Sequence, residues 1–276
     1  MQVRSPRVIA LLIALGLSAA APISAQQPGF GPRPDYDIIV PRFVDAEVTR
    51  LVGTLDTMLA VKKDPTVWAT DAAYTLWDFA RHLQTARLTA DQEARVLRHL
   101  DQVATAHPEN PGLVDKARYM VTKLTIGKTA PDIVGGDLDG VPFKLSDYRG
   151  RVVLLVFSGE WCGICRTQYP YERFLQELYK GWPFAILGVE SGDDPAVAKK
   201  TNGEQGLQFR RWWNGDARAD GTIASDWNVV GWPAAYLIDA EGVIRFVDLR
   251  DENLLKGVRQ LLLEQQQTGA TPRTPR

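Results

Sequence analysis

Two cysteines, Cys162 and Cys165, are the only cysteines among the 276 residues, and they are spaced Cys-x-x-Cys. The pair follows an apolar run over residues 151–158 and precedes a stretch with helical periodicity. Two thiols at this spacing can form and break a disulfide locally, which is typical of a redox-active dithiol. A structural disulfide between the same residues is the alternative, but so short a loop constrains little of the unfolded chain. The pattern therefore favours thiol–disulfide chemistry.

The rest of the composition argues against several other kinds of site. The net charge is −1 at pH 7 and the sequence pI is 6.3, so nothing in the charge favours binding to nucleic acid. The three histidines, His82, His99 and His107, all precede the cysteines. A thiolate metal site needs about four ligands, usually in two clusters, and the second cluster is missing. We therefore expect no metal ion and no cofactor.

Disulfide exchange requires an ionised, accessible sulfur, because a thiolate must attack one sulfur of the partner disulfide. Cys162 stands at the N-terminus of the helix expected over 165–180, where unpaired N–H groups and the helix dipole favour a negative charge. Cys165 lies one turn further on the same face. We expect Cys162 to be the exposed nucleophile and Cys165 to be the buried resolving thiol.

The N-terminus has the features of an export signal. Two arginines precede an apolar run over 8–17, and small residues follow up to Ala25. This pattern predicts a cleaved signal peptide over residues 1–25 and an exported protein, periplasmic or extracellular. An uncleaved membrane anchor over 8–25 is the alternative, since 18 uncharged residues are borderline for a span.

A helical pattern covers residues 41–126, after a Pro- and Gly-rich linker over 26–40. Apolar residues recur there at spacings of three and four, which is typical of amphipathic helices. Short connections between four such segments predict a small all-α domain. Helix starts are expected at Asp64-Pro65, at Thr89 with Gln92 in a capping box, and at Asn110-Pro111.

Beyond residue 126 short strands alternate with helices, which predicts an α/β domain with a mixed sheet over 127–267. The polar, Pro-bearing residues 268–276 are expected to form a disordered tail. A β-hairpin is expected within 128–150, strands over 151–158, 184–189 and 209–213, a second hairpin over 234–249, and helices over 165–180, 195–207 and 253–266.

Several motifs occur in a fixed order along this domain: Gly127–Asp132, Leu145–Gly150, Trp161–Arg166, Pro170, and Gly231–Pro233 followed by Tyr236–Asp239. In this order the chain resembles the thioredoxin fold, and more closely the exported thiol–disulfide oxidoreductases of the TlpA/ResA type in the redoxin superfamily. The resemblance covers about residues 127–265. It implies a mixed central sheet flanked by helices, here preceded by an all-α domain to which the resemblance does not extend.

The resemblance also implies roles for residues outside the cysteine pair. A cis proline at Pro233 would lie against the cysteines, and the backbone beside it would pair with a bound peptide. An ordinary trans turn proline is the alternative at this position. Trp161 and Trp232 would then flank the sulfurs and form an apolar rim that binds an unfolded or extended substrate.

Attack by Cys165 on a mixed disulfide needs a nearby proton acceptor. Thioredoxin carries a buried aspartate where this chain has Val156, so that acid is missing. The TlpA/ResA resemblance implies a glutamate at the end of the next strand, and Glu190 follows the run 185–189. Ser191 competes for this position, and a solvated acid without a catalytic role is the other alternative.

Taken together, the resemblance implies an exported enzyme that reduces protein disulfides by dithiol exchange. Its partners would be protein thiol clients, such as apocytochrome c in cytochrome c maturation or a copper-site thiol pair, and a membrane thiol carrier as electron donor. A thiol peroxidase of the same superfamily is one alternative, but Gly159 stands where peroxidases carry threonine. A redox-linked adaptor or binding module that uses residues 41–126 is another.

Overall fold

The structure is a computed structural model. It describes residues 42–60, 65–110, 112–217 and 219–268. The predicted signal peptide, the linker and all but the first residue of the predicted tail lie outside these ranges. Within them, no helix combines the length and the apolar character needed to cross a bilayer.

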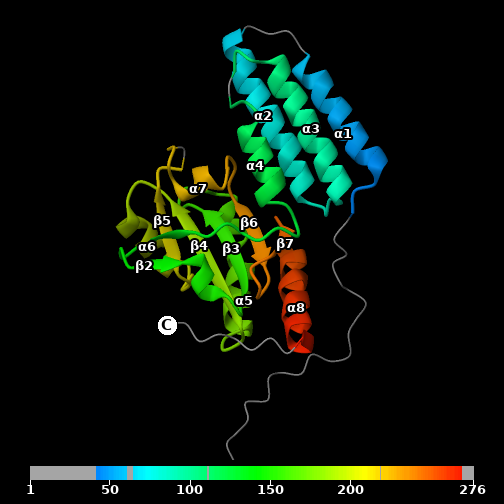
Figure 1. The fold of residues 1–276 in the computed structure, drawn as a ribbon. Helices are drawn as coiled ribbons and strands as arrows, with labels where there is room; N and C mark the ends of the chain where they lie inside the picture. The colour runs from blue at the N-terminus through cyan, green and yellow to red at the C-terminus, as the bar shows by residue number, and fades with distance from the viewer. Residues whose placement is uncertain (1–41, 61–64, 111, 218, 269–276) are drawn as a thin grey trace, which may run out of the picture. The chain divides into compact units, whose positions relative to one another are not determined.

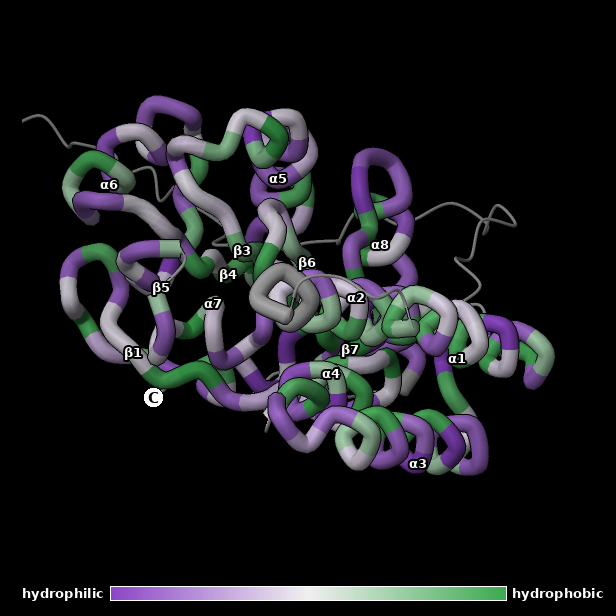
Figure 2. The backbone as a smooth tube through the Cα atoms, turned by 90° about the horizontal axis from the view of Figure 1, so that it is seen from above, coloured by the Kyte–Doolittle hydropathy of each residue, from purple (hydrophilic) through white to green (hydrophobic). Residues whose placement is uncertain are grey.

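Four helices form the N-terminal part of the described chain, as the sequence predicts. They are α1 (Asp45–Leu59), α2 (Pro65–Gln84), α3 (Ala90–Ala106) and α4 (Asp115–Lys123). Hydrophobic and hydrophilic residues alternate along α1 and α3 in Figure 2, as one-sided burial of a helix requires. The Thr89 Oγ accepts a hydrogen bond from the Gln92 N–H at 3.2 Å, and the Gln92 side chain accepts one from the Thr89 N–H at 2.9 Å. The predicted capping box is therefore confirmed.

The fourth helix begins later than the sequence predicts, at Asp115 instead of Asn110. Gly112 has a φ of +83°, and the Leu113 N–H donates to the Asn110 carbonyl at 3.1 Å. A residue in the left-handed region cannot continue a right-handed helix, so a turn precedes α4.

A five-stranded mixed sheet forms the centre of the C-terminal part (Figure 1). The strand order is β5-β4-β3-β6-β7, with β3 parallel to β4 and antiparallel to β6. Every residue of β3 is buried, as expected for a strand covered on both faces. The predicted thioredoxin fold is confirmed. The strands are β3 (Val152–Ser158), β4 (Phe184–Ser191), β5 (Arg211–Gly215), β6 (Ala234–Ile238) and β7 (Ile244–Val247).

The remaining elements surround this sheet. The predicted first hairpin is confirmed, and β5 begins two residues later than predicted. The short helix α7 was not predicted, because four residues are too few to show a helical period. These elements are β1 (Val134–Gly136), β2 (Pro142–Lys144), α5 (Tyr169–Leu178), α6 (Pro195–Glu204), α7 (Ile223–Asp226) and α8 (Asp251–Thr268).

One hydrophobic core extends through both the helices and the sheet. It contains Leu76 and Leu83 of α2 together with Phe157 of β3 and Tyr236 of β6. The described residues accordingly belong to a single compact unit. The boundary between an all-α domain and a thioredoxin-like domain at residues 126 and 127 stays a prediction.

Candidate active site

Cys162 and Cys165 form a disulfide, with their Cα atoms 5.3 Å apart. The pair lies between β3 and α5, and the Cys165 N–H donates to the Cys162 sulfur at 3.1 Å. The expectation of one continuous helix over 165–180 is wrong at its start. A 3-10 turn, η2 (Cys165–Thr167), comes first, and the α-helix begins only at Tyr169. Pro170 contributes to this break because it has no N–H to donate to the preceding turn.

The expectation that Cys162 is exposed is wrong for this disulfide form. Only 5% of Cys162 and 1% of Cys165 is accessible. Both cysteines pack with Tyr169 and Leu207, and Trp232 packs against the same cluster. Cys162 is slightly more accessible than Cys165, as expected, but both residues are buried. Its accessibility therefore does not support the enzymatic interpretation, which depends on the comparisons below.

Exposed apolar side chains border the covered disulfide. Trp161 is 50% exposed and Ile164 is 70% exposed. The Trp161 ring meets the Trp232 ring edge-on, with 5.7 Å between centroids. The Trp161 indole N–H donates to the Ser191 carbonyl at 3.1 Å. A Cβ at Gly159 would lie 2.6 Å from the Ser191 carbonyl oxygen and 2.6 Å from Trp161 Nε1, so glycine is required there. The two predicted tryptophans thus lie together next to the cysteines.

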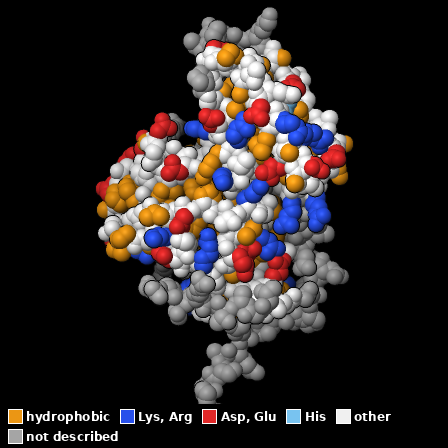
Figure 3. Space-filling model, in the orientation of Figure 1, with side chains coloured by type: hydrophobic (Ala, Val, Ile, Leu, Met, Phe, Trp, Pro, Cys, Tyr) orange, Lys and Arg blue, Asp and Glu red, His pale blue; other side chains and the backbone are white. Residues whose placement is uncertain are grey.

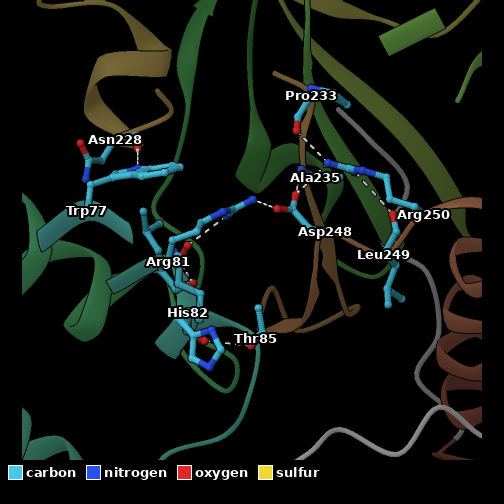
Figure 4. Close-up of polar contacts among 12 residues, drawn as sticks. Trp77, Arg81, His82, Thr85, Asn228, Pro233, Ala235, Asp248, Leu249 and Arg250 are labelled. Carbon is cyan, nitrogen blue, oxygen red and sulfur yellow. Dashed lines mark hydrogen bonds and ion pairs between the residues drawn. The ribbon is translucent and has the colours of Figure 1, made fainter. Parts of the chain in front are cut away.

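Pro233 follows a cis peptide bond, the geometry that the resemblance implies. Its carbonyl accepts a hydrogen bond from the Arg250 guanidinium at 2.7 Å. Arg250 also donates to Asp248 at 3.1 Å, and the same Asp248 oxygen accepts from the Ala235 N–H at 2.9 Å (Figure 4). The residues that follow β7 therefore hold the Pro233 loop in place.

Glu190 is fully buried at the end of β4, so the alternative of a solvated acid is wrong. Its Oε2 lies 2.8 Å from Arg211 Nη1 and accepts a hydrogen bond from the Ser158 hydroxyl at 3.2 Å. Burial raises the pKa of Glu190, and the Arg211 charge opposes this shift. The competing residue, Ser191, is also buried and accepts from the Asn214 amide at 3.1 Å.

Sequence reasoning missed three polar residues in this buried region: Tyr169, Glu172 and Arg211. Burial raises the pKa of Glu172 to about 7 and that of Tyr169 to about 12, and the Glu190 charge adds to both shifts. Arg211 fits because Gly188, its register partner on β4, has no side chain; a Cβ there would lie 2.6 Å from Arg211 Cγ. Arg211 contacts Glu190 and not Glu172, so Glu172 is the carboxyl group that favours its protonated form.

We call Tyr169, Glu172, Glu190 and Arg211 the buried polar cluster. Tyr169 joins it to the disulfide, because its ring packs with both cysteines and the charges of both carboxyl groups help to raise its pKa. Two signals in the sequence point to this cluster. Cys165, Tyr169 and Glu172 have the i, i+4, i+7 spacing of one helix face. Arg211 lies in an expected strand, where a buried charge needs a partner.

The raised pKa of Glu172 predicts a specific pH dependence of stability. The native state binds this proton more tightly than the unfolded chain does. The resulting stabilisation is therefore complete below pH 4.5, the ordinary value, and is lost as the pH rises through about 7. Between pH 4 and 8 the free energy of unfolding of the wild type should fall by on the order of 3 kcal/mol because of Glu172, and this fall should be missing in Glu172→Gln. Urea unfolding at both pH values measures it.

Glu177→Gln is the matched control, because Glu177 is exposed on the same helix. If Glu172→Gln loses as much unfolding free energy between the two pH values as Glu177→Gln and the wild type, the assignment of a raised pKa to Glu172 is wrong.

Comparison with known proteins identifies the family. The AhpC/TSA family model matches residues 126–247. The thiol-disulfide oxidoreductase ResA of Geobacillus kaustophilus is 36% identical over 124 residues, which cover 45% of this chain and 69% of the relative. ResA of Bacillus subtilis is 27% identical over 118 residues, or 43% of this chain and 64% of the relative. A solved thioredoxin domain from a Bacteroides vulgatus thiol-disulfide oxidoreductase has 29% identity and a TM-score of 0.46, covering 51% of this chain and 99% of that chain. With more than two thirds of the Geobacillus protein matched at this identity, the chain belongs to the ResA family of thiol–disulfide oxidoreductases.

Proposed function

We propose that this oxidoreductase is exported and reduces disulfides in protein clients. The observation that carries the proposal is the position of the Cys162–Cys165 disulfide between an exposed apolar rim and the Pro233 loop. Apolar side chains around a reactive sulfur favour an extended polypeptide over a small hydrophilic disulfide. Export is inferred from the signal-like residues 1–25, and the reducing direction from the resemblance to the TlpA/ResA type.

The proposed reaction begins with the reduced protein. The Cys162 thiolate attacks one sulfur of the client disulfide, that S–S bond breaks, and the other client sulfur leaves as a thiolate and takes up a proton. Cys165 loses its proton and attacks the Cys162 sulfur of the mixed disulfide. The second client sulfur leaves as a thiol, and the Cys162–Cys165 disulfide forms. Two electrons have then passed from the dithiol to the client.

The hydrogen bond from the Cys165 N–H to the Cys162 sulfur supports this division of roles. In the reduced protein, a donor at that distance would favour the thiolate form of Cys162 and lower its pKa. The Cys165 sulfur is the more deeply buried of the two, which suits a thiol that attacks only within the protein.

We assign to Glu190 the role of accepting the Cys165 proton, through the buried polar cluster. Arg211 favours the ionised form that can accept a proton, while burial raises the pKa of Glu190 and so favours the protonated form. Tyr169 packs against both cysteines, and the charge of Glu190 raises the pKa of its hydroxyl.

The proposed partners follow from the chemistry of the site and from the resemblance. Clients would present a disulfide in an unfolded or extended segment, as apocytochrome c or a copper-site protein does. A membrane thiol carrier would return the electrons by attacking the disulfide. Trp161 and Trp232, whose rings meet edge-on, would contact the client beside the reacting sulfur.

Variants of the two cysteines test the proposal directly. Cys162→Ser should reduce the rate of insulin disulfide reduction to that of the uncatalysed reaction, because no attacking sulfur remains. Cys165→Ser should accumulate a mixed disulfide with the client, visible as a shifted band on non-reducing gels. Retention of activity by Cys162→Ser would refute the nucleophile assignment.

Titration of the dithiol against glutathione distinguishes the direction of transfer. A strongly oxidising reduction potential of this dithiol, about −120 mV, would overturn the reductase proposal. Rapid consumption of peroxide by the reduced wild type would instead favour the peroxidase alternative, which the AhpC/TSA match keeps relevant.

The role of Glu190 needs a pair of variants, because Glu190→Gln alone leaves the buried Arg211 charge without its partner. Loss of one partner from such a pair costs about 3–5 kcal/mol of stability. Glu190→Gln with Arg211→Met removes both charges and should restore much of the stability. We expect this double variant to remain slow in client release near neutral pH, with a flattened pH–rate profile. A wild-type profile would eliminate Glu190 from the mechanism.

A further inference from the structure

A cleft of about 780 Å³ opens beside the tryptophans of the active site. Trp161 and Trp232 line it, together with the loop residue Val230. Lys116 of helix α4 also lines it. The cleft therefore has walls from both the thioredoxin fold and the helices that precede it.

A second cavity, of about 540 Å³, adjoins this cleft, because Lys116, Asn228 and Val230 line both. Its other walls carry Tyr74 and Trp77 of α2. Tyr74 is 62% exposed, and its ring lies 5.5 Å from that of Trp77 between centroids. In Figure 3 hydrophobic side chains gather on the surface where the helices meet the thioredoxin fold. The hollow thus extends from the active-site rim to an aromatic pair on α2.

Side-chain contacts fix α2 and the wall of this hollow relative to each other. The Trp77 indole N–H donates to the Asn228 carbonyl at 3.0 Å. Arg81, on the same helix, forms an ion pair with Asp248, which also binds the Ala235 N–H next to the Pro233 loop (Figure 4). The helical wall is therefore tied to the same loop that borders the cysteines.

The charge of the hollow favours a basic occupant. Asp193 and Asp220 are exposed on the larger cleft, whereas Lys116 is the one basic side chain among its described lining residues. Exposed carboxylates at this density raise the local concentration of cationic groups. The aromatic end of the hollow favours an apolar side chain.

We propose that helices α2 and α4 complete the client-binding site, which deepens the proposed function and rests on it. The hollow holds an extended segment of the client polypeptide that flanks the reacting cysteine. The cysteine lies at the Trp161–Trp232 end, a basic residue faces the aspartates, and an apolar or aromatic residue contacts Tyr74. Continuity with the active-site rim and complementary charge select this occupant over a second copy of the chain.

A cysteine-free peptide tests the binding site separately from the redox reaction. The probe is an extended peptide with serine at the reacting position, one arginine and one tryptophan, titrated into the full-length oxidised protein by calorimetry. Tyr74→Ala should raise the dissociation constant of the peptide about fivefold, because one aromatic contact is lost. Phe174→Ala is the matched control, since Phe174 is a similarly exposed aromatic residue on α5, away from the hollow.

Several outcomes would overturn the inference. Equal affinities of Tyr74→Ala and the wild type would do so, as would the absence of saturable binding. Concentration-dependent dimerisation that Tyr74→Ala abolishes, without peptide binding, would assign the hollow to a second copy. Reduction of hydroxyethyl disulfide should be unchanged in Tyr74→Ala, and an equal loss there would show that Tyr74 acts on the dithiol. Failure of the wild type to reduce any protein disulfide would refute the proposed function while leaving peptide binding as an independent result.

Discussion

The buried ion pair between Glu190 and Arg211 is the interaction on which the active-site region depends. A charge at this depth costs several kcal/mol unless a partner of opposite sign lies in contact with it. The 2.8 Å contact joins the carboxyl end of β4 to the first residue of β5, and the Ser158 hydroxyl connects it to β3, which leads into the cysteine loop. This ion pair therefore adds a side-chain link to the backbone pairing of the three strands beside the disulfide.

Much of this architecture could be predicted from the sequence, because its signals are local. The apolar run of β3, the capping box at Thr89 and the spacing of the two cysteines each depend on neighbouring residues only. The late start of α4 was not predicted, since it depends on the backbone conformation at Gly112. The buried polar cluster was only partly foreseen. Glu190 was placed through a family resemblance, whereas Glu172 and Arg211 acquire their roles from contacts between separate elements.

The covered disulfide also lay beyond sequence reasoning. The exposure of Cys162 depends on Tyr169, Leu207 and Trp232, of which only Tyr169 is near it in the sequence. Helix position alone predicted an accessible sulfur, because it takes no account of the side chains that pack over the helix end. The same limitation applies to the hollow beside the active site, whose walls are formed by helices and a loop more than one hundred residues apart in sequence.

The single hydrophobic core has a consequence for how this architecture can change during evolution. Leu76, Leu83 and Tyr236 pack in one cluster, so the thioredoxin fold is not an interchangeable module here. Removal of the helices would uncover a large apolar surface on the β6 side of the sheet, and such a surface promotes aggregation. Recombination that exchanged this segment among related proteins would therefore succeed only if the facing residues of both parts were inherited together.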